Sequence, residues 1–190
     1  MAWPKGNKGR QRDGNRAAEV ISRIRALVKN VPSDRDRLDV NEAILEAIAL
    51  SRSELHRNSV ELRTHLSSEV PLIPADRVQL QQVILNLIVN AIEAMSGVGD
   101  RTRELVVGSG ANDSRDVFVE VRDSGSGFDP GDLRRLFDSF YTTKRNGMGM
   151  GLSISRSIIE AHGGRLWARP NEPHGAVFWF TLPVEDDRTS

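Results

Sequence analysis

Five polar residues recur along the otherwise apolar stretch from Gln79 to Met95. On a helix, at about 100° per residue, they fall within an arc of about 80° and form one polar stripe: Gln79, Gln82, Asn86, Asn90 and Glu93. A helix that is apolar on the rest of its surface is a buried helix, so the stripe must face something polar. Either neighbouring backbone and water satisfy these groups, each of which would otherwise cost about 1–3 kcal/mol, or the stripe lines a ligand cavity.

A carboxylate and two glycines follow an apolar strand pattern, at Asp123, Gly125 and Gly127. Asp123 could form a structural Asx turn. Alternatively, a partly buried carboxylate accepts a hydrogen bond from the exocyclic amine of adenine, whereas guanine would place its carbonyl oxygen against that carboxylate. The residues alone leave both interpretations open.

Three glycines alternate just before an amphipathic helix pattern, at Gly147, Gly149 and Gly151. Glycine lets backbone N–H groups approach an anion closely, and a helix N-terminus adds partial positive charge. The spacing therefore suits a phosphate cradle with Lys144 as a nearby cation, and a plain flexible loop is the alternative. In the stripe, Asn90 offers a neutral oxygen of the kind that Mg²⁺ accepts.

The elements that must position these residues mix helices and strands without strict alternation. We expect helices from Asp39 or Asn41 to about Leu50, from a cap at Asp76 through Met95, from Pro130 through Phe137, and from Leu152 onward. We expect strands at Val60–Leu66, Glu104–Gly108, Val117–Val121, Arg165–Ala168 and Ala176–Leu182. This order predicts an α/β sandwich with helices packed on one face of a mixed sheet.

Composition bounds the function classes. The 190 residues suit one domain with appendages, and 38% hydrophobic with 27% charged residues is ordinary for a soluble protein. A formal net charge of zero gives no overall field toward nucleic acid or anionic membrane. Cysteine is absent, which excludes disulfides, and no apolar run approaches the roughly 18 residues of a membrane span. We expect a cytoplasmic protein without nucleic acid or a membrane segment.

The chain divides into four parts. Residues 1–16 are a Gly-, Lys- and Arg-rich stretch that we expect to be a disordered basic lead, in part a fusion remnant. Residues 17–31 carry an amphipathic helical pattern too short to stand alone. Residues 32–186 hold the motifs and the strands, and residues 187–190 are a tail.

Four segments, NLIVNAIEA, DSGSG, FDSFYTTK and GMGMGL, resemble in order and spacing the N, G1, F and G2 boxes of the GHKL ATPase superfamily. More narrowly, the chain resembles the catalytic ATP-binding domain of bacterial sensor histidine kinases from about Ala17 to Val184. The resemblance implies the Bergerat fold, a two-layer α/β sandwich in which three helices cover one face of a mixed sheet of about five strands. It also implies that residues 17–31 are the end of the second dimerisation helix.

The same resemblance implies the ligands, ATP and Mg²⁺, and the residues that contact them. The catalytic residues would be Asn86, Asn90 and Lys144, and Asn90 would hold Mg²⁺. The nucleotide would contact Asn86, Asn90, Glu93, Asp123, Gly125, Gly127, Thr142, Thr143, Lys144, Gly147, Gly149, Gly151 and Leu152. Residues 137–145 would form the mobile ATP lid, with Asp123 on the adenine and the three alternating glycines on the phosphates.

Two departures from the family pattern define the expected reaction. The family phosphorylates a histidine that precedes Glu or Asp on a dimerising helix, and none of His56, His65, His162 and His174 stands in such a sequence. Asn86 stands where branches that hydrolyse ATP or phosphorylate serine carry a glutamate base, and an imidazole acceptor needs no such base. We therefore expect transfer of the γ-phosphoryl group to a histidine on a dimerisation domain outside this chain, and no self-phosphorylation.

Partners and alternatives follow from the same comparison. The expected partners are ATP, the dimerisation domain, which Phe137, Phe140 and Tyr141 would contact, and a downstream response regulator. Without complete dimerisation helices we expect a monomer or a weak dimer through residues 17–29. A non-catalytic ATP-sensing module and an anti-sigma-type serine kinase are the alternatives, and Asn86 disfavours the second. Ala176 stands where some relatives carry a threonine that supports the adenine-binding aspartate.

Overall fold

A five-stranded mixed sheet carries the domain in the computed structural model, which describes residues 37–99, 101–112, 116–142 and 148–184. The strands, in spatial order, are β2 (Val60–Leu66), β4 (Arg103–Ala111), β5 (Val117–Asp123), β7 (Ala176–Leu182) and β6 (Arg165–Pro170). Only β2 and β4 are parallel, and the other neighbours are antiparallel. A separate two-stranded pair joins β1 (Arg37–Leu38) to β3 (Ile73–Pro74), a short pairing that the sequence pattern did not indicate.

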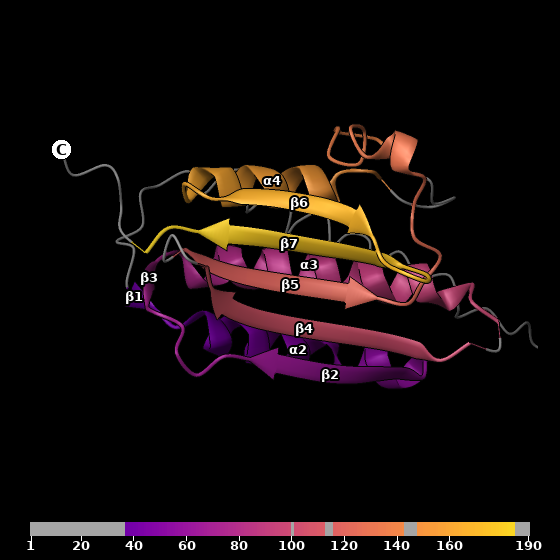
Figure 1. Cartoon of the computed structure of the whole chain (residues 1–190), viewed down its shortest axis with the longest axis horizontal. Coiled ribbons are helices and arrows are strands. Elements are labelled where there is room, and N and C mark those ends of the chain that lie inside the picture. Colours follow the sequence, from indigo (N-terminus) through magenta and orange to yellow (C-terminus); the bar gives the residue numbers. More distant parts are fainter. Residues whose placement is uncertain (1–36, 100, 113–115, 143–147, 185–190) are drawn as a thin grey trace, which may run out of the picture. The chain divides into compact units, whose positions relative to one another are not determined.

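Three helices, α2 (Val40–Arg57), α3 (Arg77–Ser96) and α4 (Gly151–Ala161), lie against one face of the sheet (Figure 1). This confirms the expected two-layer α/β sandwich. Figure 1 shows α3 between the other two helices, behind the middle strands. The central position explains why α3 is apolar on most of its surface: it contacts a helix on each side as well as the sheet.

The core lies between the helices and the sheet. On α3 the buried residues are Leu80, Val83, Ile84, Leu87, Ile88, Ala91, Ile92 and Met95. Alternate residues of the strands meet them, with Leu105 and Val107 on β4 and Phe180 and Leu182 on β7. By length and composition α3 would pass as a membrane span, but these contacts make it the core helix of the domain.

The helix starts follow the expected capping. Asp39 accepts the backbone N–H of Asn41 at 2.8 Å, and Asp76 accepts that of Gln79 at 3.0 Å. The end of α2 was predicted about seven residues too early, because the helix continues to Arg57. Its buried face continues through Ser51 and Leu55, so packing extends the helix past the exposed Leu50.

The helix predicted from Pro130 through Phe137 is absent. A 3₁₀ turn, η1 (Pro130–Asp132), is followed by turns instead, and Leu133 is exposed. Leu136 and Phe137 pack against the core but Leu133 does not, so this short apolar pattern gains too little shared packing to offset the cost of helix nucleation.

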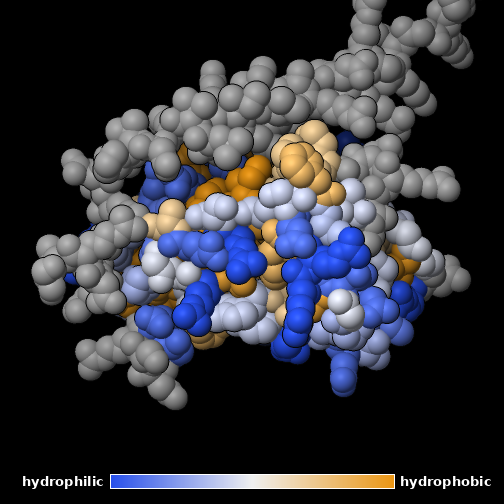
Figure 2. Space-filling view, turned by 90° about the horizontal axis from the view of Figure 1, so that it is seen from above, coloured by the Kyte–Doolittle hydropathy of each residue, from blue (hydrophilic) through white to orange (hydrophobic). Residues whose placement is uncertain are grey.

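The exposed side of α4 is polar, whereas Ser155, Ile158 and Ile159 are buried. Figure 2 shows the molecule from above, over α4 and β6, and hydrophilic residues cover most of the described surface there. The predicted parts at residues 1–16, 17–31 and 187–190 lie outside the described residues.

Candidate functional site

The polar stripe of α3 faces the start of α4. Gln79, Gln82, Asn86 and Asn90 are half-buried and Glu93 is exposed. The Asn86 side-chain amide donates a hydrogen bond to the Ser155 hydroxyl at 3.0 Å. A Cβ added at Gly151 would lie 2.5 Å from Asn86 Oδ1. The beginning of α4 therefore rests directly on the middle of the stripe, as a phosphate cradle over the stripe requires.

Asp123 is the last residue of β5 and is only 2% exposed. Its Oδ1 accepts the backbone N–H of Gly125 at 2.8 Å and that of Ala176 at 3.3 Å. Its backbone carbonyl accepts the Asn171 side-chain amide at 3.0 Å. These N–H donors offset the cost of burying a carboxylate, and they fix the direction in which it points.

The loop after β5 packs against the end of α3. Ser126 donates its backbone N–H to the carbonyl of Ala94 at 3.1 Å, and a Cβ at Gly125 would come within 2.8 Å of the Ala94 backbone. Gly127 has a φ of 68°, and a Cβ there would lie 2.7 Å from the Gly175 carbonyl oxygen. Both predicted glycines thus allow a backbone approach that another residue would prevent.

The two loops therefore meet α3 at different heights. The glycine-rich segment meets it at Asn86 and the loop after Asp123 meets it at Ala94, so eight residues, or about 12 Å of helix, separate them. Asn90 lies midway and is half-buried. This arrangement suits an elongated ligand that binds one group at Asp123 and an anionic group at the start of α4.

The segment that leads from η1 to α4 is held together by a contact between Phe140 and Gly149. Phe140 donates its backbone N–H to the carbonyl of Gly149 at 2.9 Å, and a side chain at Gly149, whose φ is 65°, would overlap the backbone of Phe140 and Tyr141. Phe140 has a φ of 70° and is 75% exposed. Leu152 is half-buried against the core, and Thr142 is exposed. The predicted Thr143, Lys144 and Gly147 lie outside the described residues.

Cations contact two aromatic rings of this segment. The Arg135 guanidinium lies 4.6 Å from the centroid of the Tyr141 ring, and that of Arg156, from α4, lies 5.7 Å from the Phe137 ring. Desolvation, together with a hydrogen bond to Asp132, raises the pKa of the Tyr141 phenol. The start of the predicted lid is thus held by specific contacts.

The four histidines lie in different elements, and only His162 is buried. His162 is 5% exposed; its Nε2 accepts the backbone N–H of Asp76 at 3.1 Å, and its Nδ1 lies 2.8 Å from the Ile158 carbonyl oxygen. It therefore ties the end of α4 to the start of α3. His65 lies on β2 as predicted, His56 is in the last turn of α2, and His174 is in the β6–β7 loop.

Several contacts were not predicted from the sequence. Asn86 contacts Ser155, and Asp123 contacts Asn171 and Gly175. Only the contact with Ser155 could have been suggested by the sequence, because Gly151 and Ser155 are four residues apart and so share one helix face.

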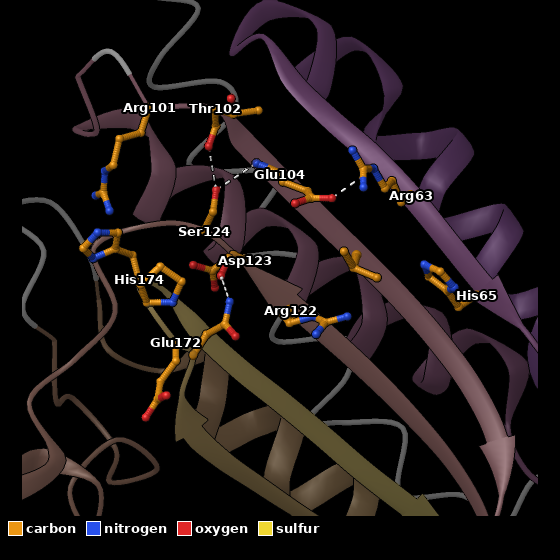
Figure 3. A pocket seen from close by; sticks show the side chains of 13 residues that line it. Arg63, His65, Arg101, Thr102, Glu104, Arg122, Asp123, Ser124, Glu172 and His174 are labelled. Atoms are coloured by element: carbon orange, nitrogen blue, oxygen red, sulfur yellow. Dashed lines mark hydrogen bonds and ion pairs between the residues drawn. The ribbon is translucent and has the colours of Figure 1, made fainter.

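A cavity of about 370 Å³ lies on the opposite face of the sheet from the helices, against Asp123 and Ser124 and away from the polar stripe (Figure 3). Its lining comes from three strands and three loops, and no sequence pattern joins them.

A profile of the family described as histidine kinase-, DNA gyrase B-, and HSP90-like ATPase matches residues 75–186. Sensor protein FixL of Bradyrhizobium diazoefficiens is 46% identical over 172 residues, which cover 90% of this chain and 34% of FixL. This chain therefore spans about a third of the length of that relative.

Solved structures share the fold. The nucleotide-free catalytic domain of histidine kinase ThkA matches with a TM-score of 0.69 and 33% identity, over 78% of this chain and 95% of that one. Histidine kinase ThkA in complex with response regulator protein TrrA matches with a TM-score of 0.77 and 27% identity, over 97% of this chain and 53% of that one.

Proposed function

Because this chain belongs to the histidine kinase-, DNA gyrase B-, and HSP90-like ATPase family, we propose that it is the catalytic ATP-binding domain of a two-component sensor histidine kinase. It would transfer the γ-phosphoryl group of ATP to a histidine on a dimerisation domain. One observation carries this proposal: α3 contacts the loop after Asp123 at Ala94 and the start of α4 at Asn86, which gives a nucleotide two separate binding regions on one helix.

Asp123 is the proposed adenine ligand. Its carboxylate is buried and oriented by the N–H groups of Gly125 and Ala176, so little conformational entropy would be lost when it accepts a hydrogen bond from the adenine amine. Position 176, where the family pattern has a threonine in some members, supports the carboxylate here through its backbone N–H at 3.3 Å. Gly125 and Gly127 would shape the same pocket by holding its loop against α3.

The phosphates would lie at the start of α4. The backbone of Gly151 approaches Asn86 of the stripe, and that of Gly149 approaches Phe140 and Tyr141, both more closely than a residue with a Cβ could. The N–H groups at this helix start would face the phosphate oxygens. We propose that Gly147, Thr142, Thr143 and Lys144 complete the cradle and that Glu93 is a peripheral contact at the exposed end of the stripe.

Mg²⁺ would be held by Asn90 with phosphate oxygens and water. An amide carbonyl oxygen at this half-buried position fits a hard cation that takes its other ligands from phosphate oxygens and water. When bound, the ion would neutralise charge on the transferring phosphoryl group.

The Asn86 amide fits a histidine acceptor. It has no basic group, and its hydrogen bond to Ser155 holds it in place beside Gly151. The acceptor imidazole attacks phosphorus with its own lone pair; the P–N bond forms as the P–O bond to ADP breaks, and ADP leaves. Asn86 would position the reactants, and slow hydrolysis by water is expected.

The partners belong to the same proposal. The response regulator in the ThkA–TrrA complex supports a downstream regulator for this chain, and Phe140 would contact the dimerisation domain because it is the most exposed aromatic residue of the described lid segment. We propose a cytoplasmic domain that is monomeric or weakly dimeric.

A transfer assay tests the proposal. The chain is mixed with ATP, Mg²⁺ and an isolated dimerisation domain from a sensor kinase of the FixL type, and the product is exposed to acid. An acid-labile phosphorylated product supports a histidine kinase. An acid-stable product indicates a serine kinase, and nucleotide binding without any product indicates a regulatory module.

A further inference from the structure

The cavity behind Asp123 is lined by three arginines and two histidines that the nucleotide site does not use. Arg63 and His65 come from β2, Arg122 from β5, Arg101 from the segment before β4 and His174 from the β6–β7 loop. The register of the sheet aligns Arg63, Val106 and Arg122 across three strands, so two arginines stand on either side of one small apolar residue. The remaining lining includes the uncharged Thr102, Ser124 and Asn171 and the acidic Glu104, Asp123 and Glu172.

The acidic residues nearby leave part of this charge uncompensated. Arg63 is paired with Glu61 at 3.0 Å and with Glu104 at 2.9 Å. Arg122 Nε lies 3.9 Å from Glu120, at the limit of an ion pair. Arg101 makes no ion pair within the part of the chain that the structure describes.

Figure 3 shows how these groups are distributed. The Arg101 side chain points toward His174 at one end, and Arg122 points toward Arg63 and His65 at the other, whereas the Glu172 carboxylate points away from Arg101. The arginines thus lie at two separate ends of the cavity rather than in one convergent cluster. Two single negative charges spaced along an extended chain match this arrangement better than one multiply charged phosphate does.

We propose that this cavity is a docking site for the carboxylates of an acidic protein segment. The cavity opens on the face of the sheet that the helices leave uncovered, so a segment from another domain or chain can reach it (Figure 1). Guanidinium groups bind carboxylates through paired N–H donors, and Thr102 adds a hydroxyl group beside them. The Ser124 hydroxyl already donates to the Thr102 carbonyl at 2.9 Å, which fixes this rim of the cavity.

The site is coupled to the adenine ligand through one loop. Asn171 donates its side-chain amide to the Asp123 carbonyl, and Ala176 donates its backbone N–H to Asp123 Oδ1, so both ends of the β6–β7 loop are fastened to Asp123. His174 lines the cavity from the same loop. A bound segment that holds His174 would restrict the motion of the β6–β7 loop. If the proposed nucleotide site is correct, this would raise the affinity for nucleotide about two- to five-fold, and bound nucleotide would raise the affinity for the segment by the same factor.

The test uses the whole chain and a short probe. Acetyl-Glu-Gly-Glu-amide is titrated while backbone amide shifts are followed by NMR, with the Gln-Gly-Gln peptide and inorganic phosphate as comparisons. We expect saturable shifts at Ser124 and His174 and at least five-fold weaker binding for Arg101→Gln. The control Arg165→Gln removes an exposed arginine outside the cavity and should bind like wild type. The proposal would be overturned if the Gln peptide or phosphate bound as tightly as the Glu peptide. It would also be overturned if Arg101→Gln and Arg165→Gln lost the same amount of affinity for the Glu peptide.

Coupling is measured separately. The affinity for a non-hydrolysable ATP analogue is determined with and without the peptide, in wild type and in Asn171→Ala. An increase in wild type that Asn171→Ala abolishes supports the coupling, and no increase overturns it. If the chain binds the peptide but never binds nucleotide, the docking site stands and the proposed kinase function fails.

Discussion

Gly151 and Asn86 fit together only because position 151 has no side chain: a Cβ there would lie 2.5 Å from Asn86 Oδ1. Asn86 is at the same time fixed by its hydrogen bond to Ser155, one turn further along α4. The contact sets how close the start of α4 approaches the polar stripe, and with it the proposed position of the phosphates.

Gly151→Ala should therefore weaken nucleotide binding more than it weakens the fold. The added methyl group displaces the Asn86 amide and breaks its bond to Ser155, a loss of about 1 kcal/mol of unfolding free energy. We expect at least ten-fold weaker binding of an ATP analogue by calorimetry, with the unfolding transition shifted by only a few degrees.

Gly97→Ala is the matched control, because a Cβ at Gly97 meets nothing within 4 Å and the residue already has a right-handed helical φ of −91°. Unchanged nucleotide affinity in Gly151→Ala would contradict the proposed phosphate position.

Phe140→Ala should reduce phosphoryl transfer without changing ATP affinity. The ring is 75% exposed and its backbone is anchored to Gly149, so the side chain is presented outward and not used in the described fold. We expect at least five-fold slower transfer to an added dimerisation domain. Leu50→Ala, an exposed apolar residue on α2, serves as control. Equal loss of transfer and of ATP affinity in Phe140→Ala would exclude a docking role.

His162→Phe should destabilise the domain although the ring volume is kept. The substitution leaves the Asp76 backbone N–H without its acceptor and the Ile158 carbonyl without its ring partner, which costs about 1–3 kcal/mol of unfolding free energy. Urea denaturation measures the loss. The exposed His65→Phe should change stability by no more than about 0.5 kcal/mol, and similar losses in both variants would mean that the two bonds contribute little.

Helices, caps and turns were predicted correctly where the local sequence pattern alone determines them. The polar stripe of α3, the cap at Asp76 and the loop glycines were predictable, because each depends on residues close in the chain. The helix predicted through Phe137 was wrong: Leu136 and Phe137 pack against the core but Leu133 is exposed, so the apolar residues do not cover one surface together. The end of α2 was misplaced because burial of Leu55 by the rest of the domain decides it.

The contacts between residues far apart in the sequence could be seen only in the structure. The bond from Asn86 to Ser155 joins residues 69 positions apart, and that from Asn171 to Asp123 joins residues 48 apart. Neither has a local signature. The cavity on the open face of the sheet depends on the register of β2, β4 and β5, which strand patterns alone do not define.

The most direct test of the account is a calorimetric titration of a non-hydrolysable ATP analogue, with and without Mg²⁺, into the wild-type chain and into Asp123→Asn. The account predicts Mg²⁺-dependent binding in wild type. Because a hydrogen bond to a charged group contributes about 1.5–3 kcal/mol, it also predicts about 10- to 150-fold weaker binding in the variant. A folded wild-type chain that binds no analogue, or a variant that binds as tightly as wild type, would contradict the assignment of Asp123 as the adenine ligand.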